Sequence, residues 1–329
     1  MRMKALKLFR EEGRRLSRMV EQDVDDLDPG EVLIKAQYAA VNYKDARAVT
    51  GVGSVVSRYP CIPGVEVAGS VVESSSTAFR AGDLVTVQGG RDFGMRRDGA
   101  YGEFARVPAA WVARIPADSD PFESVALGIA AYTSALAVEE LVARGVTPDK
   151  GPVLVTGGTG GSSSFAIDML AGLGYRVVAS SGKAAESEYL KRIGASEVIG
   201  REDIAAGDKP LEGQRWAGAI DAVGGKPLDA LLRSMMERGV VCAFGNAAGE
   251  TLSTSIYPFI LRGVSLVGIN GNHPVPERGS AWARMQKGGD LRPRHIGAIA
   301  YTIAFNDLQA HCEKLIGAGA RGRAVVKFA

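Results

Sequence analysis

The sequence has 329 residues, 46% of them hydrophobic and 23% charged, and 39 basic against 37 acidic residues give a net charge of +2. This length exceeds what one hydrophobic core usually organises, so we expect two domains. The ordinary apolar content and the lack of a glycine repeat exclude collagen-like and disordered chains, and balanced charge without a basic stripe argues against a nucleic-acid partner.

Short strands separated by Gly, Pro and Asp dominate the first part of the chain. The expected strands are Met3–Phe9, Glu31–Ala40, Val65–Glu73, Leu84–Val87 and Glu103–Pro108. This spacing predicts a mainly β domain. Around Phe122 to Gly145 the pattern changes to the periodicity of a helix.

From Pro152 onward, strands and helices alternate. The expected strands are PVLVTG, YRVVAS, SEVI, WAGAIDAVG, GVVCAFG and VSLVGIN, and the helices between them are SFAIDMLAGLG, EYLKRIG and DALLRSMMERG. This succession predicts a doubly wound parallel sheet. A helical stretch near Glu277 to Gln286 follows, and then a strand, a helix and a strand that we expect to rejoin the β domain. The domains would be 1–122 completed by 300–329, with 123–299 inserted.

A glycine-rich turn separates the first strand and helix of the predicted parallel sheet. The turn reads Gly157, Gly158, Thr159, Gly160, Gly161, Ser162, Ser163 and Ser164. A dinucleotide pyrophosphate lies against such a backbone, where a Cβ would obstruct it, and the helix N-terminus supplies amide donors. The alternative is a tight turn without a ligand.

The end of the second predicted strand indicates which dinucleotide binds. NAD sites usually carry an acid here, whereas this chain reads Ser181, Gly182, Lys183, with no acid before Glu186. A hydroxyl and a cation suit a 2′-phosphate, which favours NADP. The alternative is a solvated Lys183 at a helix start. Arg201 is either a second phosphate ligand or an isolated surface arginine.

Several segments carry a family resemblance. They are VNYKDARAVTG (41–51), YPCIPGVEVAG (59–69), GDLV (82–85), GAYGEFARV (99–107), VLVTGGTGG, SSGK, EYLKRIGASEVI, WAGAIDAVGG and PFILRGVSLVGIN. With them the chain resembles the zinc-free branch of the medium-chain dehydrogenase/reductase superfamily, and within it the acryloyl-CoA reductase (NADPH) group, often labelled quinone oxidoreductases.

The resemblance implies an α/β fold with a GroES-like, mainly β substrate domain and an inserted Rossmann domain, with NADPH in the cleft. The implied reaction is hydride transfer to an α,β-unsaturated thioester. The resemblance also places Tyr43 next to the nicotinamide. There a phenol can hydrogen-bond the cofactor or protonate the substrate α-carbon, while Asn42 orients a carbonyl. The alternative for Tyr43 is a buried structural side chain.

The resemblance also assigns cofactor contacts to Gly160, Gly161, Gly245, Asn246, Ile260 and Gly271, beside the serines of the turn. Some positions depart from the family. Ser162 and Ser163 replace Val and Gly, so that Ser163 adds a hydroxyl, and Asn246 replaces an apolar residue. Asn270 and Gly271 replace the usual aspartate and serine, so the substrate pocket is expected to differ.

Metal ligands are missing where zinc-dependent relatives hold them. Asn42 stands where those relatives have Cys, and Val65 precedes Glu66 where they have a His-Glu pair. We therefore expect no metal. Three well-separated cysteines suggest no disulfide framework and fit a reducing compartment. The N-terminus lacks a signal peptide pattern, and no apolar run reaches the roughly 18 to 20 residues that span a bilayer, so we expect a soluble cytoplasmic protein.

The leading hypothesis is an NADPH-dependent reductase of activated carbon–carbon double bonds, with acryloyl-CoA as acceptor. The alternatives are NADPH:quinone oxidoreduction and a non-catalytic protein that binds or senses NADPH. The acceptor would be a small molecule, an acyl-CoA thioester or a quinone or enone. We also expect a homodimer, because the apolar strand Val264–Asn270 should end the sheet with an unpaired edge.

Overall fold

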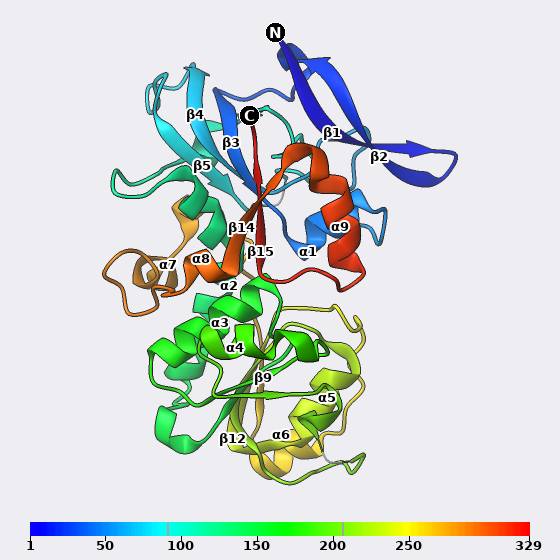
Figure 1. Cartoon of the computed structure of the whole chain (residues 1–329), viewed down its shortest axis with the longest axis vertical. Helices are drawn as coiled ribbons and strands as arrows, with labels where there is room; N and C mark the ends of the chain where they lie inside the picture. The colour runs from blue at the N-terminus through cyan, green and yellow to red at the C-terminus, as the bar shows by residue number, and fades with distance from the viewer. Residues whose placement is uncertain (91, 206) are drawn as a thin grey trace. The chain divides into compact units, whose positions relative to one another are not determined.

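The computed structural model describes residues 1–90, 92–205 and 207–329 (Figure 1). The chain divides into two compact units. The first comprises 1–129, 272–278 and 300–329, and the second comprises 130–271 and 279–299. The first unit therefore includes the short segment Asn272–Arg278, which the sequence had assigned to the inserted domain.

The first unit is built from antiparallel strands. The hairpin of β1 (Arg2–Glu11) and β2 (Arg14–Asp23) reaches out from the unit, as Figure 1 shows. A seven-stranded sheet has the order β14-β15-β3-β4-β5-β7, with β6 paired to β3. Its strands are β3 (Val32–Ala40), β4 (Glu66–Ser74), β5 (Leu84–Gln88), β6 (Phe104–Val107), β7 (Ala113–Arg114), β14 (Ala300–Ala304) and β15 (Arg323–Lys327). The C-terminal strand β15 thus lies inside this sheet, between β14 and β3.

Two helices, α1 (Tyr43–Val49) and α9 (Leu308–Ile316), contact each other within the first unit. The core of the unit combines strand residues with side chains from the connecting loops. Its largest fully buried members include Leu6, Ile34, Ile62, Phe93 and Tyr101. Burial of this apolar area, at about 25 cal/mol per Å², is the main favourable term that holds the loops to the sheet.

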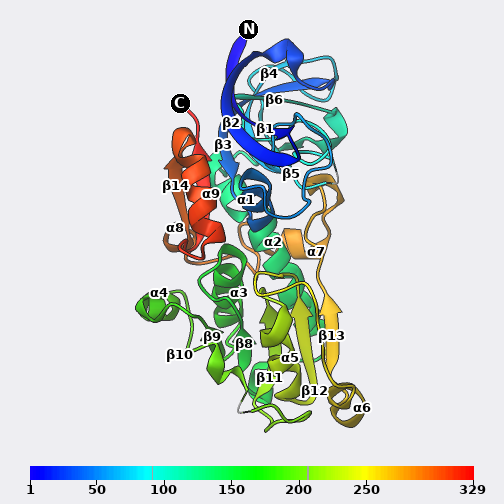
Figure 2. The same ribbon diagram turned by 90° about the vertical axis from the view of Figure 1, so that its right-hand side faces the viewer.

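The second unit is a six-stranded, fully parallel sheet of order β10-β9-β8-β11-β12-β13. Its strands are β8 (Val153–Val155), β9 (Val177–Ser180), β10 (Glu197–Ile199), β11 (Trp216–Asp221), β12 (Met235–Ala243) and β13 (Ser265–Gly268). Its further helices are α3 (Gly161–Gly172), α4 (Ser187–Arg192), α5 (Gly225–Arg233), α6 (Tyr257–Arg262), α7 (Ser280–Arg284) and α8 (Ile296–Ile299), seen from a second side in Figure 2. The strand order reverses between β8 and β11, which is where such sheets bind ligands.

Helix α2 (Pro121–Ala143) continues from the first unit into the second. It is long and apolar enough to cross a bilayer, which corrects the expectation that no stretch of this chain has that length and hydropathy. However, 78% of its most apolar window is buried inside the protein, as in the core helix of a globular domain. Gly128 interrupts it with φ 38° and ψ −143°, a conformation that favours glycine.

The predicted fold class is confirmed: a mixed β domain and a doubly wound parallel sheet are both present. Most strands agree with their predicted bounds to within a few residues. The stretch Ser234–Gly239 was predicted as helix, which is wrong, because β12 already begins at Met235. The strand bulges there, with Arg238 at φ 57° and a register shift against β11. Strand β2 and helices α1, α6 and α8 were not predicted.

Asp168 on α3 holds the end of the segment 279–299 in the second unit. Its Oδ2 accepts hydrogen bonds from the backbone amides of Arg294 and His295, both at 2.8 Å. Its Oδ1 lies 3.0 Å from Nδ1 of His295. The carboxylate is almost fully buried, so these three contacts replace its hydration.

We expect Asp168→Ala to lower the free energy of unfolding by about 3 kcal/mol, because two backbone amides lose the buried carboxylate that accepts from them. Urea unfolding followed by circular dichroism measures this. Asp290→Ala is the matched control: Asp290 is exposed and forms a surface ion pair with Arg284, so its loss should cost about 1 kcal/mol or less. Equal losses in the two variants would contradict the prediction.

Candidate functional site

The glycine-rich turn lies at the carboxyl end of β8, where the strand order of the second unit reverses. Gly157 has φ 58°, and a Cβ on Gly158 would approach the side chains of Ala179 and Leu190 to 3.2 and 3.3 Å. Gly160 is the exposed N-cap of α3, which begins at Gly161. The turn therefore presents the first amides of a twelve-residue helix without an obstructing side chain, which suits a phosphate.

Two serines of the turn face into the unit. The buried Ser163 hydroxyl donates to the carbonyl of Thr156 at 2.9 Å, and the buried Ser164 hydroxyl donates to the carbonyl of Gly158 at 3.0 Å. Ser162, which is partly exposed, accepts through its carbonyl from Ser134 Oγ at 2.6 Å. The hydroxyl of Ser163 thus braces the turn, and its contacts do not support the additional cofactor contact that the sequence suggested.

A hydrogen-bonded link joins the two strands on either side of the reversal. Thr156 Oγ1 donates to Oδ1 of the buried Asp221 at 2.6 Å and accepts from the amide of Ala222 at 3.0 Å. The other oxygen of Asp221 accepts from the amide of Gly224 at 2.8 Å. These contacts fix the carboxyl ends of β8 and β11 relative to each other.

The residues predicted to choose the cofactor lie together at the end of β9. The amide of Lys183 donates to Ser181 Oγ at 3.0 Å. Gly182 is exposed, and a Cβ there would come within 2.7 Å of Nε of Arg201. The structure therefore brings the Arg201 guanidinium to the Ser181–Lys183 loop, although Arg201 follows a different strand. A hydroxyl and two cations can coordinate the oxygens of a 2′-phosphate.

The remaining predicted cofactor residues are less closely grouped. Gly245 touches the backbone of Ala222, where a Cβ would overlap the carbonyl, and the exposed Asn246 side chain faces Glu250. Gly271 packs against Thr133. An open hollow at the carboxyl ends of β12 and β13 is lined by Ala243, Phe244, Gly245, Gly268, Ile269 and Asn270.

Ile260 lies away from the other predicted cofactor residues. It is 64% exposed on α6, which leads into the amino end of β13. Arg262 of the same helix donates to the carbonyls of Arg233 and Met235, at the start of β12. The glycine-rich turn lies at the opposite, carboxyl ends of these parallel strands.

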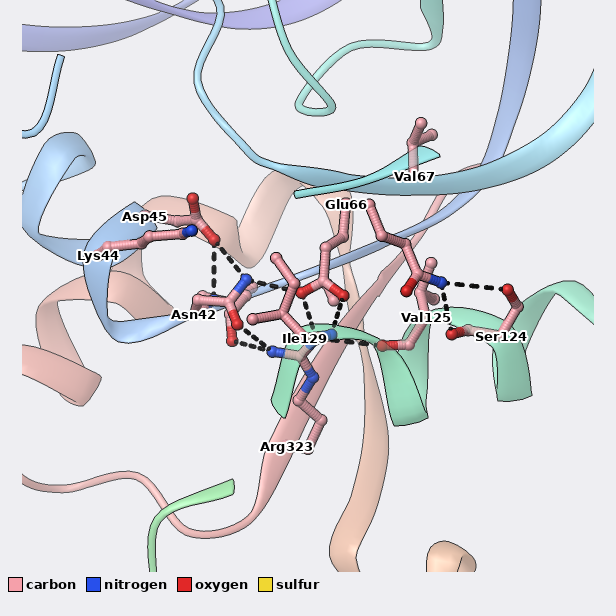
Figure 3. Close-up of polar contacts among 12 residues, drawn as sticks. Asn42, Lys44, Asp45, Glu66, Val67, Ser124, Val125, Ile129 and Arg323 are labelled. Carbon is pink, nitrogen blue, oxygen red and sulfur yellow. Dashed lines mark hydrogen bonds and ion pairs between the residues drawn. The ribbon is translucent and has the colours of Figure 1, made fainter. Parts of the chain in front are cut away.

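In the first unit, Asn42 caps helix α1 and is fully engaged by its neighbours (Figure 3). Its Nδ2 donates to Asp45 Oδ2 at 2.9 Å and to Glu66 Oε2 at 2.7 Å, and its Oδ1 accepts from Arg323 at 2.7 Å. Both amide hydrogens are thereby used within the chain. These contacts suit a residue that positions the start of α1, and they leave no amide hydrogen to orient a substrate carbonyl.

A buried ion pair joins Glu66 on β4 to Arg323 on β15. The two side chains are 0% and 2% exposed. Glu66 Oε1 accepts from the amide of Ile129 at 2.6 Å, and Arg323 also donates to the carbonyl of Val125 at 3.1 Å. A Cβ on Gly128 would overlap the Glu66 carboxylate, so the break in α2 admits this group.

Two further charged residues of α1 lie beside this pair. Burial raises the pKa of the Asp45 carboxyl and lowers the pKa of the Lys44 ammonium. Lys44 Nζ donates to Asn272 Oδ1 at 2.6 Å, which ties α1 to the segment Asn272–Arg278. Tyr43, the first residue of α1, is half-buried.

Sequence reasoning had not assigned roles to Lys44, Asp45, Glu66 or Arg323. For Glu66 a signal existed, because it occupies a position that zinc-dependent relatives use. Asn42 and Val65 stand at the other ligand positions, and among residues 1–90, 92–205 and 207–329 no three His, Cys, Asp or Glu side chains form a group able to hold a metal ion. Arg323 had no local signal, since it follows Glu66 by 257 residues.

Two family models match the chain. Residues 28–117 match the alcohol dehydrogenase GroES-like domain, and residues 161–287 match the zinc-binding dehydrogenase family. The chain is 40% identical to YhfP of Bacillus subtilis, named for quinone oxidoreduction, over 92% of each chain. It is 39% identical to AcuI of Escherichia coli, named for acrylyl-CoA reduction, over 99% of each.

Solved structures agree with the fold. The yhdH oxidoreductase of Salmonella enterica, in complex with NADP, matches with a TM-score of 0.91 and 37% identity over 100% of both chains. YhfP, solved with NAD bound, matches with a TM-score of 0.91 and 38% identity over 100% of both chains.

We expect Arg323→Met and Glu66→Gln each to lower the free energy of unfolding by about 3 to 5 kcal/mol, because each leaves a buried charge without its partner. The double variant should lose less than the sum of the two, since it removes both charges. Denaturant unfolding of the three variants tests this, and strictly additive losses would contradict it.

Proposed function

Because this chain belongs to the medium-chain dehydrogenase/reductase family, in the branch without zinc ligands, we propose that it is an NADPH-dependent reductase of activated carbon–carbon double bonds that converts acryloyl-CoA to propanoyl-CoA. The observation that carries the proposal is the glycine-rich turn at the strand reversal, with Ser181, Lys183 and Arg201 gathered at the end of β9. Relatives named for acrylyl-CoA reduction support the choice of acceptor.

The residues present fit NADPH. Gly158 packs closely against Ala179 and Leu190, which holds the turn against the sheet, and the amides of α3 supply donors for the pyrophosphate. Ser181, Lys183 and Arg201 hold the 2′-phosphate, while Gly245 lines the separate hollow at the carboxyl ends of β12 and β13. When bound, the cofactor supplies the hydride. The second unit is then the cofactor domain, and the first unit, which holds Tyr43, is the substrate domain.

The chain itself supplies orientation and a proton. In this proposal the Tyr43 phenol donates a proton to the substrate α-carbon or hydrogen-bonds the nicotinamide ribose or amide. Asn42, held by Asp45, Glu66 and Arg323, fixes the first turn of α1 and therefore the place of Tyr43. Asn42 is thus a positioning residue. Such preorganisation lowers the barrier because the acid does not have to be ordered during the reaction.

Quinone reduction is the second candidate, because YhfP is named for it. Initial rates of NADPH oxidation with acryloyl-CoA, a quinone and a simple enone, compared side by side, decide between the acceptors. We expect the highest kcat/KM with acryloyl-CoA. A preference for the quinone would replace the proposed function, and no turnover with any acceptor despite tight NADPH binding would favour a sensing protein.

We expect the unmodified protein to prefer NADPH to NADH, and Lys183→Ala to reduce that preference about ten- to hundredfold, because one charge-assisted contact to the 2′-phosphate is lost. The ratio of kcat/KM for the two cofactors measures it. Lys191→Ala, which removes an exposed lysine on α4 paired with Glu188, is the control. Equal kcat/KM with NADPH and NADH would contradict the prediction. YhfP, which has been solved with NAD bound, shows that a similar protein can take the other cofactor.

We expect Tyr43→Phe to lower kcat roughly 100-fold or more if the phenol protonates the α-carbon, and less if it only positions the cofactor, while the fold stays intact. Steady-state kinetics together with circular dichroism provide the measurement. Unchanged kcat and KM would remove Tyr43 from both roles.

We propose that the protein is a cytoplasmic homodimer. All three cysteines are buried and unpaired, which fits a reducing compartment. Strand β13 ends the parallel sheet in the part of the chain that the structure describes, and the adjoining surface is apolar: Ile260 and Leu261 are 64% and 62% exposed. A second copy that continues the sheet would cover both features.

Light scattering across the accessible concentration range should therefore give twice the mass of a 34.5 kDa chain. Leu266→Lys, on β13, should lower the measured mass without loss of the circular dichroism signal, because Leu266 is partly exposed at the edge. A mass of one chain for the unmodified protein would exclude the dimer.

A further inference from the structure

The hydroxyl of Tyr189 joins α4 to the first turn of α3 in the second unit. Tyr189 is 4% exposed, and its hydroxyl donates to Ser164 Oγ at 2.9 Å. Ser164 Oγ in turn donates to the carbonyl of Gly158 at 3.0 Å. A hydroxyl can accept one hydrogen bond while it donates another, so these groups form a single chain from α4 to the glycine-rich turn.

Gly158 is held at both of its polar backbone groups. Its amide donates to the carbonyl of Ser180, the last residue of β9, at 2.9 Å, and its carbonyl accepts from Ser164. Leu190, the residue after Tyr189, is fully buried and packs against the same glycine, where a Cβ would approach it to 3.3 Å. The place of the glycine-rich turn therefore depends on α4 as well as on β9.

The segment proposed to hold the 2′-phosphate runs directly into α4. Ser181–Lys183, which we call the 2′-phosphate loop, follows β9, and a short 3-10 helix, Ala184–Glu186, leads from it to the start of α4 at Ser187. Helix α4 has only six residues, too few to be stable by itself, so packing sets its place. Tyr189 and Leu190 are its two buried residues. The 2′-phosphate loop and the glycine-rich turn are thus connected through them.

We propose that Tyr189 is a positioning residue that couples the 2′-phosphate loop to the glycine-rich turn, so that the preference for NADPH over NADH depends on its hydroxyl. The inference rests on the proposed function, which assigns the loop and the turn to the 2′-phosphate and the pyrophosphate of one cofactor. The adenosine ribose limits the spacing of these phosphates. NADPH therefore binds best when loop and turn are already held at that spacing, whereas the phosphates of NADH need only the turn.

Titration with NADPH and with NADH, followed by the fluorescence of the reduced nicotinamide, gives both dissociation constants without an acceptor. In Tyr189→Phe we expect the ratio of the Kd for NADH to the Kd for NADPH to fall about fivefold, because one buried hydrogen bond no longer holds the loop to the turn. Ser164→Ala interrupts the same chain and should lower the ratio by a similar factor. The double variant should lose no more than either single variant.

Tyr175→Phe is the matched control. Tyr175 is also buried in the second unit, at 7% exposure, and its hydroxyl donates to the carbonyl of Val146 at 2.6 Å. It precedes β9, however, and so lies at the amino end of the strand whose carboxyl end carries the 2′-phosphate loop. Urea unfolding should show a loss of stability in both phenylalanine variants, whereas only Tyr189→Phe should change the cofactor ratio.

Adenosine 2′-monophosphate separates coupling from a direct contact, since it can fill the 2′-phosphate loop without occupying the turn. Its affinity, measured by calorimetry, should be the same in the unmodified protein and in Tyr189→Phe. The proposal is overturned if the cofactor ratio is unchanged in Tyr189→Phe, if Tyr175→Phe lowers the ratio equally, or if adenosine 2′-monophosphate loses as much affinity as NADPH.

The proposed function is assayed separately, by reduction of acryloyl-CoA in the unmodified protein. Absence of that activity would refute the proposed reaction and leave the coupling supported, because all the binding measurements are made without an acceptor. Full activity together with an unchanged cofactor ratio in Tyr189→Phe would refute the coupling and leave the reaction supported. An unmodified protein that binds no NADPH would refute both.

Discussion

The buried contact between Glu66 and Arg323 constrains most of the first unit, because it joins segments that the sequence keeps far apart. A carboxylate and a guanidinium removed from water must find all their partners inside the protein. Here those partners include the Asn42 amide group, the carbonyls of Val41 and Val125 and the amide of Ile129, while Nε of Arg323 has none among the described residues. The arrangement therefore holds the start of α1, the broken part of α2 and the strand β15 to one point.

This pair costs desolvation energy that a well-packed apolar pair would not, so stability alone does not explain it. Its benefit is geometric. A charged pair with directional hydrogen bonds admits one arrangement of Asn42, and Asn42 caps the helix on which Tyr43 stands. Gly128 contributes to the same arrangement, because a glycine at this position leaves space for the Glu66 carboxylate. We interpret the ion pair as the means by which the first unit keeps the start of α1, and with it Tyr43, in place.

In the second unit, neutral side chains and backbone groups hold the glycine-rich turn in place. Gly157 adopts a positive φ, and the hydroxyls of Ser163 and Ser164 donate to the carbonyls of Thr156 and Gly158. At Ser163, the glycine of the family pattern is thus replaced by a side chain that stabilises the turn from inside. The exposed part of the turn remains backbone, which is what a pyrophosphate contacts.

Local patterns predicted the parts of the fold that depend on local physics. Continuous apolar runs marked the buried parallel strands, and glycines marked the cofactor turn, because both signals lie within a few residues. Strand β2 was missed, since RRLSRMVEQD has few apolar residues and is held by its pairing with β1.

The charged centre of the first unit was missed for a related reason. Glu66 and Arg323 lie 257 residues apart, and a single sequence carries no signal of that contact. Arg201 lies between these two cases, because the sequence offered its role only as one of two alternatives. The sequence offered it as a phosphate ligand or as a lone surface residue, and its guanidinium lies beside Gly182. Two strands, β9 and β10, end next to each other, and the register of that pairing decides which side chains meet. Chemistry that depends on strand order becomes predictable once the sheet topology is known, whereas a buried ion pair between distant segments requires the packed structure.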